Sequence, residues 1–172
     1  GNIGLVSMYL SRYFERVFTL EPSWEHFDAL NRNLQVNEIK NVKPINKALF
    51  MKDGSFPYGG PSFNKTMRSL HSSTWQDGKS SEIVEAITLE TLVKDENLDR
   101  VDLLKLDVEG SEAEILCSES FKNVSPKIKT VIFETHKWGG RHPNQIMDAL
   151  KSLGYVIRGF PHDNEIFIAE KK

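Results

Sequence analysis

The chain has 172 residues, with 39% hydrophobic residues, 27% charged residues and a net charge of −2, values typical of a globular domain with one core. Basic and acidic residues are interspersed, and no apolar run approaches the ~20 residues of a membrane span, so we expect neither a nucleic-acid nor a membrane partner. Cys117 is the only cysteine, which excludes an internal disulfide and fits a reducing, cytoplasmic compartment.

The first fifty residues alternate between helical and extended patterns. Apolar residues recur at helical spacing in two segments, and short β-rich runs follow each of them. Pro22 falls in the first turn of the second helix, where its missing N–H is tolerated. The predicted elements are a helix over 3–14, a strand over 16–20, a helix over 22–36, and a strand over 42–46 that residues 48–50 continue.

Residues 54–81 break this rhythm, because glycine, serine and proline are frequent there. A loop of this length inside a compact domain is functional or disordered, and we predict a loop insertion that recognises a substrate. Its aromatic residues suit stacking, and Arg68 or His71 suits polar groups. Trp138 is a further candidate for lining the same substrate-binding opening. The alternative is a surface excursion without a binding role.

The second half alternates strands with helices and closes on a hairpin. Strands are predicted over 83–87, 101–107 and 129–135, helices over 88–94, 111–119 and 143–153, and hairpin strands over 155–160 and 165–170. Gly154 stands where a helix C-cap glycine is expected. This order predicts one α/β domain over residues 1–172, with a mainly parallel sheet and an antiparallel C-terminal hairpin.

A glycine-containing segment and a carboxylate flank the first predicted helix and strand. Gly1-Asn2-Ile3-Gly4 opens the helix, and Glu21 ends the strand 17 residues after Gly4. Glycines let backbone N–H groups approach a ligand, and a carboxylate at this place can accept hydrogen bonds from ribose hydroxyls. The pair indicates an adenosine-containing cofactor. The alternative is that Glu21 and the following proline only begin a helix.

The stretch "LLKLDVEGSE", residues 103–112, places charged groups inside and after a strand. Lys105, Asp107 and Glu109 share one face of the strand if it runs on. A buried lysine needs a partner, and a neighbouring carboxylate is the obvious one. A helix start explains the end of the stretch, with Ser111 and Glu114 as a capping box and Glu112 as a solvated first-turn residue.

The chain resembles the FkbM family of S-adenosylmethionine-dependent methyltransferases over nearly all of its length. Gly1, Asn2 and Gly4 match the last part of the family's D-x-G-[AG]-N-x-G motif, but the leading aspartate, the first glycine and the strand before them are absent. The resemblance implies a Rossmann-like class I methyltransferase sheet whose first central strand is missing from this chain. It is carried by "GNIG", "FTLEPSWEHFDALNRNLQVN", "NKALF", "ITLETLV", "VDLLKLDVEGSEAEIL", "VIFETH" and "LKSLGYVI".

The resemblance also implies roles for individual residues around S-adenosylmethionine. The glycine segment would line the methionine and ribose, Glu21 would hold the ribose hydroxyls, and Asp107 would border the amino-acid end of the cofactor and the acceptor. The full set of implied cofactor-binding residues is Gly1, Asn2, Gly4, Glu21, Pro22, Ser23, Lys47, Ala48 and Asp107.

The catalytic candidates are Asp107, Glu109 and His136, because methyl transfer to a hydroxyl requires removal of a proton. His136 has the pKa range suited to a base, and its alternative reading is a loop histidine bonded to backbone. Glu134 is a further candidate, read as structural and paired with Lys105. Asp107 and Glu109 suit a metal ion, but no third ligand is evident, so we predict none.

The resulting hypothesis is an S-adenosylmethionine-dependent methyltransferase that methylates oxygen on a small molecule or glycan. A nicotinamide-dependent oxidoreductase is the first alternative, because it would use the same glycine segment and Glu21. A catalytically inactive methyltransferase-like binding module is the second. The sequence carries no signal of the acceptor or the oligomeric state.

Overall fold

The computed structural model describes residues 1–59, 70, 82–136, 143–160 and 163–171. Its helices are α1 (Leu5–Leu10), α2 (Trp24–Val36), α3 (Leu89–Asp95), α4 (Glu112–Leu116), α5 (Glu119–Val124), the 3-10 turn η2 (Ser125–Lys127) and α6 (Pro143–Ser152). Its strands are β1 (Val17–Leu20), β2 (Val42–Ile45), β3 (Ala48–Leu49), β4 (Gly54–Tyr58), β5 (Glu82–Ile87), β6 (Val101–Leu106), β7 (Ile128–Glu134), β8 (Tyr155–Phe160) and β9 (Asp163–Lys171).

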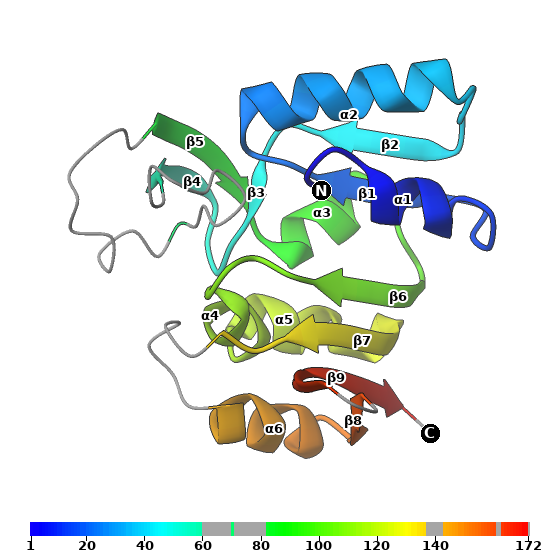
Figure 1. Cartoon of the computed structure of the whole chain (residues 1–172). Helices are drawn as coiled ribbons and strands as arrows, with labels where there is room; N and C mark the ends of the chain where they lie inside the picture. The colour runs from blue at the N-terminus through cyan, green and yellow to red at the C-terminus, as the bar shows by residue number, and fades with distance from the viewer. Residues whose placement is uncertain (60–69, 71–81, 137–142, 161–162, 172) are drawn as a thin grey trace.

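The strands form three hydrogen-bonded groups, ordered β1-β2, β3-β5-β4 and β6-β7-β9-β8. The pairs β1–β2, β3–β5 and β6–β7 are parallel, and Figure 1 shows β2, β1, β6 and β7 running in the same direction. The predicted α/β class is therefore confirmed. Within the described residues β1 pairs only with β2, and β6 only with β7; the absence of a central strand from the chain stays a prediction.

Helix α2 packs its apolar stripe against β2, with Leu30 and Leu34 buried beside Val42. The helix begins at Trp24 with Ser23 as its N-cap, so Pro22 precedes the helix and is not in its first turn as predicted. The Ser23 N–H donates to the Glu21 side chain, which holds the backbone in an extended turn before the helix starts.

The first residues of the predicted loop insertion are a strand. β4 pairs antiparallel with β5, and Tyr58 is buried against Val84. The rings of Phe50 and Phe56 pack edge to face with centroids 5.0 Å apart. The prediction of a loop over residues 54–58 is therefore wrong. Most of the remaining insertion, including Arg68 and His71, lies outside the described residues.

The predicted helix over 111–119 ends earlier, as α4 at Leu116, and a second helix that was not predicted, α5, begins at Glu119. The Ser118 hydroxyl accepts the Phe121 N–H at 3.1 Å, which starts α5 after a break. The capping box at the start of α4 is not formed, because the buried Ser111 hydroxyl has no hydrogen-bond partner among the described residues. The side chain of Glu112 accepts the backbone N–H groups before α4 instead.

The C-terminal half contains the largest core. Residues from α3 to β9 form one apolar cluster around Leu106, Phe121 and Phe133. Gly154, at φ +85°, ends α6 as predicted, and β8 and β9 form the predicted antiparallel hairpin. β9 also pairs antiparallel with β7, which joins the hairpin to the parallel strands. In the described part of the chain, no helix combines the length and apolarity needed to cross a membrane.

Candidate active site

Glu21 and the glycine segment meet at the carboxyl end of β1. The Asn2 N–H donates to Glu21 Oε2 at 2.6 Å, and the Ser23 N–H donates to Glu21 Oε1 at 3.0 Å. Glu21 is only 5% exposed, whereas Gly1 and Asn2 are exposed. The sequence predicted that Glu21 follows a strand one helix after the glycine segment, and the structure confirms this placement; the role of these residues in holding a cofactor stays a prediction.

Both glycines of the segment are required by close contacts. A Cβ added to Gly1 would lie 2.6 Å from the Leu20 carbonyl oxygen. Gly4 has φ +94°, and a Cβ there would lie 2.4 Å from Leu30 Cδ1. The Gly4 N–H also donates to the Gly1 carbonyl at 3.1 Å. Glycine is therefore the residue that lets this tight loop rest on β1 and α2.

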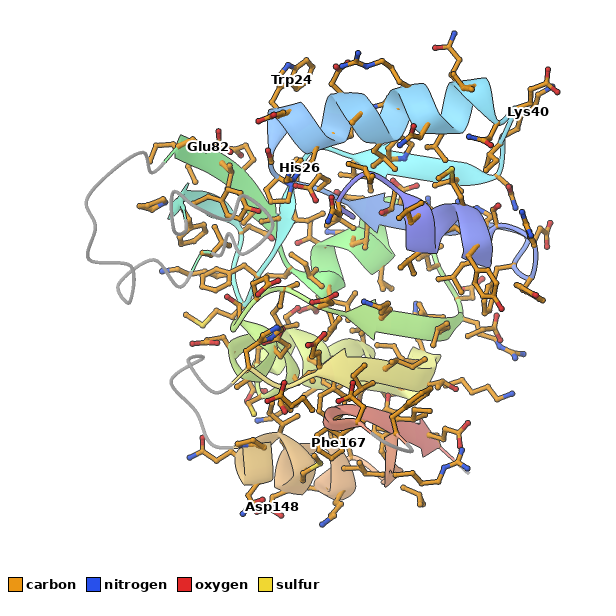
Figure 2. All side chains as sticks on the ribbon, viewed as in Figure 1. Trp24, His26, Lys40, Glu82, Asp148 and Phe167 are labelled. Atoms are coloured by element: carbon orange, nitrogen blue, oxygen red, sulfur yellow. The ribbon has the colours of Figure 1, made fainter. Side chains whose placement is uncertain are left out.

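Two polar groups that sequence reasoning missed complete the surroundings of Glu21. The Asn46 amide donates to the carbonyls of Glu21 and Pro22 at 2.9 and 3.2 Å. His26 Nδ1 lies 3.8 Å from Glu21 Oε1. In Figure 2, His26 points from α2 toward the body of the protein, while Trp24 points away from it. Both residues lie in segments that carry the family resemblance, "NKALF" and "FTLEPSWEHFDALNRNLQVN", but the sequence assigned them no role, because they reach Glu21 from separate elements.

Lys105 and Asp107 form the pair predicted at the end of β6. Lys105 Nζ lies 3.0 Å from Asp107 Oδ2, but the side chains are 35% and 40% exposed. The predicted burial of Lys105 is therefore wrong, because its long stem carries the ammonium group to solvent near the strand end. Strands β1 and β6 run in the same direction (Figure 1), so their carboxyl ends lie at the same edge.

His136 follows β7 and is surrounded by carboxylates. Its side chain is 6% exposed; Nδ1 lies 2.9 Å from Glu112 Oε1, and Nε2 lies 3.5 Å from Glu109 Oε2 and 3.8 Å from Glu134 Oε1. Burial lowers the pKa of His136, but the hydrogen bond and charge of Glu112, with the charges of Glu109 and Glu134, raise it to about 9. The imidazole is therefore protonated at neutral pH.

Glu112 is buried, and the prediction of a solvated residue is wrong. It is 2% exposed, and its Oε1 and Oε2 accept the N–H groups of Val108 and Gly110 at 2.9 and 3.0 Å. The backbone turns inward here, with φ +53° at Glu109 and +106° at Gly110. These two bonds satisfy N–H groups before α4, so the turn closes without the predicted capping box.

The other two carboxylates beside His136 hold their protons more tightly than usual. Burial is the main reason that the pKa values of Glu109 and Glu134 are raised, and neighbouring acidic groups add to it. The ligand atoms of Asp107, Glu109 and His136 lie within 4.8 Å of one another, so the structure brings in a third group that the sequence did not reveal. A metal ion would have to displace the proton of His136, and no metal remains our prediction.

The remaining predicted residues lie at the edges of this region or outside it. Ser23 is buried as the N-cap of α2, and Ala48 is buried in the apolar cluster of β3, β4 and β5. Pro22 and Lys47 are partly exposed. Trp138 lies outside the described residues.

A cavity of about 460 Å³ opens at the opposite ends of the strands. It lies between the segment after α1 and the first residues of β6 and β7. The polar side chains of the described residues gather instead at the carboxyl ends of the strands. They include Glu21, Asp107 and His136. In parallel sheets ligands bind at those ends, so we place the candidate site there. The cavity is lined by Tyr13, Phe14, Glu15, Asp102, Leu103, Lys129 and Thr130.

Comparison with known proteins identifies the family. The model of the methyltransferase FkbM domain matches residues 2–157. The chain belongs to the FkbM methyltransferase domain family. The resemblance drawn from the motifs is thereby confirmed.

Curated relatives of this FkbM domain are fungal methyltransferases. It is 28% identical over 191 residues to methyltransferase sdnD of Sordaria araneosa, covering 91% of the chain and 71% of that protein. It is 25% identical over 143 residues to methyltransferase 1 of Beauveria bassiana, covering 67% of the chain and 54% of that protein. The chain thus spans only part of each relative's length.

A solved structure supports the fold. The FkbM methyltransferase of Methylobacillus flagellatus superimposes with a TM-score of 0.61 at 14% identity, over 98% of this chain and 41% of that one. At this identity the likeness establishes the fold of the FkbM domain alone. The roles of individual side chains have to be argued from the geometry of the site.

Proposed function

We propose that this FkbM domain is an S-adenosylmethionine-dependent methyltransferase that methylates a hydroxyl oxygen of a small molecule or glycan. The proposal rests on one observation: two clusters of residues lie together at the carboxyl ends of the parallel strands. Glu21 and the glycine segment lie at the end of β1, and Asp107, Glu109 and His136 lie beyond β6 and β7. The cluster at β1 suits the binding of a nucleoside, and the cluster beyond β6 and β7 suits the removal of a proton.

The residues at the end of β1 fit the adenosine part of this cofactor. Each Glu21 oxygen accepts one backbone N–H and keeps a lone pair that can accept a ribose hydroxyl. Gly1 lets the segment rest directly against Leu20 and Glu21, where a Cβ would clash. We propose that Gly1, Asn2 and Glu21 hold the ribose, with Pro22, Ser23, Lys47 and Ala48 toward the adenine.

When bound, S-adenosylmethionine supplies an electrophilic methyl group, and its transfer to a hydroxyl yields a methyl ether, S-adenosylhomocysteine and a proton. The residues of this chain must align the acceptor, exclude water and take that proton. Neutral His136 can accept it at Nε2, because Nδ1 is already bonded to Glu112. We propose that Asp107 and Glu109 bind the acceptor beside Nε2.

A label-transfer assay tests this proposal. The protein is incubated with S-adenosylmethionine carrying a deuterated methyl group and with a panel of polyhydroxylated small molecules and monosaccharides. We expect S-adenosylhomocysteine to form together with a deuterated methyl ether, and His136→Gln to slow the reaction at least about 100-fold. Asp102→Asn, at the other end of β6, is the matched control and should change nothing. Label recovered on nitrogen, sulfur or carbon would contradict O-methylation, and cofactor binding without transfer would favour a binding module.

A further inference from the structure

Glu112 is a buried carboxylate that the proposed chemistry does not yet use. Burying a charge is unfavourable unless hydrogen bonds compensate it, and Glu112 has three such contacts within 3.0 Å. Two are backbone N–H groups of the preceding turn, and the third is Nδ1 of His136. The two backbone bonds close the turn, whereas the contact to Nδ1 joins that turn to the histidine that follows β7.

We propose that Glu112 is a positioning residue that fixes the tautomer and orientation of His136, so that Nε2 faces Glu109 and the methyl acceptor. The inference rests on the proposed function for the role of Nε2. The orientation itself rests on geometry, because Glu112 accepts the hydrogen of Nδ1 and leaves the lone pair of the neutral ring on Nε2.

Among the three carboxylates described around His136, Glu112 alone is placed to do this. Glu109 and Glu134 lie 3.5 and 3.8 Å from Nε2, longer than a normal N–H···O hydrogen bond. Their side chains are 23% and 33% exposed, whereas that of Glu112 is 3% exposed. Glu112 is also held by two backbone donors, so its position does not depend on the histidine.

The turn that Glu112 holds carries other groups of the site. Val108 and Gly110, whose N–H groups it binds, flank Glu109. Glu112 therefore couples the placement of Glu109 to that of His136. A role in closing the turn alone would leave the histidine's tautomer and titration unchanged, which gives a way to separate the two roles.

The test compares Glu112→Gln with Glu119→Gln by ¹⁵N NMR titration of the histidines from about pH 6 to about pH 11. Glu119 is a matched control, because it is also a first-turn glutamate but is 79% exposed and pairs with Lys122. In the unaltered protein we expect the neutral form of His136 to carry its hydrogen on Nδ1. Glu112→Gln should lower the apparent pKa of His136 by at least about one unit, and Glu119→Gln should not.

Activity supplies the second readout. We expect Glu112→Gln to move the rise of the pH–kcat/KM profile to lower pH and to reduce the high-pH plateau about 100-fold. An unchanged pKa of His136 in a folded Glu112→Gln protein would overturn the proposal. So would a hydrogen on Nε2 in the unaltered protein, which remains measurable if the variant does not fold. Because the NMR experiment needs neither cofactor nor acceptor, a failure of the proposed function would leave its result intact.

Discussion

Replacing His136 by glutamine should change how the stability of the protein depends on pH. The pKa of His136 is raised from 6.5 to about 9 in the folded protein, so the folded state holds a proton more tightly than the unfolded state does. The histidine therefore stabilises the fold fully below about pH 6.5, and this contribution disappears as the pH rises through about 9. The shift corresponds to about 3 kcal/mol, at about 1.4 kcal/mol per pH unit.

The assay is urea unfolding of the wild-type protein and His136→Gln between about pH 6 and about pH 10. The wild type should lose about 3 kcal/mol relative to the variant across this range. Asp102→Asn is the control, and its difference from the wild type should stay constant, because aspartate is ionised throughout. A constant difference for His136→Gln, or one that grows with pH, would refute the assignment of Glu112, Glu109 and Glu134 as the groups that raise this pKa.

Three further predictions concern the glycine segment, the working pH and metal ions. Gly4→Ala should destabilise the protein by about 2–4 kcal/mol in urea unfolding, because alanine resists φ +94° and its Cβ would clash with buried Leu30. The control Gly159→Ala, where the nearest atom to an added Cβ lies at 4.0 Å, should change the free energy of unfolding by less than about 1 kcal/mol. Equal losses in the two variants would contradict this reasoning. The kcat/KM of methyl transfer should rise with pH and level off above about 9, as His136 loses its proton, whereas a plateau already reached at neutral pH would exclude this base. Treatment with EDTA should leave that rate unchanged, because the proposed reaction needs only alignment of the acceptor and removal of a proton by His136; a loss restored by Mn²⁺ would show that a metal takes part.

The placement of Glu21 could be predicted from sequence because it depends on local features. A short strand ends just before Glu21, a glycine segment lies one helix earlier, and the sheet brings both to one edge. The pairing of Lys105 with Asp107 is also local, since residues two apart on a strand share a face. Its exposure was not predictable, because the strand pattern does not say where a long side chain reaches solvent.

Glu112 was misread because its burial depends on distant and unusual features. A turn with positive φ angles at Glu109 and Gly110 brings backbone N–H groups to the carboxylate, and its third partner, His136, lies 24 residues away in the sequence. An acidic residue in the first turn of a helix is usually solvated, so the local pattern favoured the wrong environment. Only the tertiary arrangement supplies the partners that make burial tolerable.

The strand β4 was missed for a related reason. Its sequence, Gly54–Tyr58, contains glycine and proline, which favour a loop in local propensity. Pro57 is tolerated because β4 lies at the edge of its group, paired only with β5 among the described residues, and an edge strand can lack one N–H donor. Pairing with a strand that begins at Glu82 is not visible in the local pattern.

Binding of S-adenosylhomocysteine, measured by titration calorimetry, tests the central claim most directly, because it requires no knowledge of the acceptor. We predict micromolar binding to the folded protein, at least about tenfold weaker binding to Glu21→Ala because charged hydrogen bonds to the ribose are lost, unchanged binding to Asp102→Asn, and no binding of NADH. A folded protein that does not bind S-adenosylhomocysteine, or that binds NADH in its place through Glu21, would contradict the account.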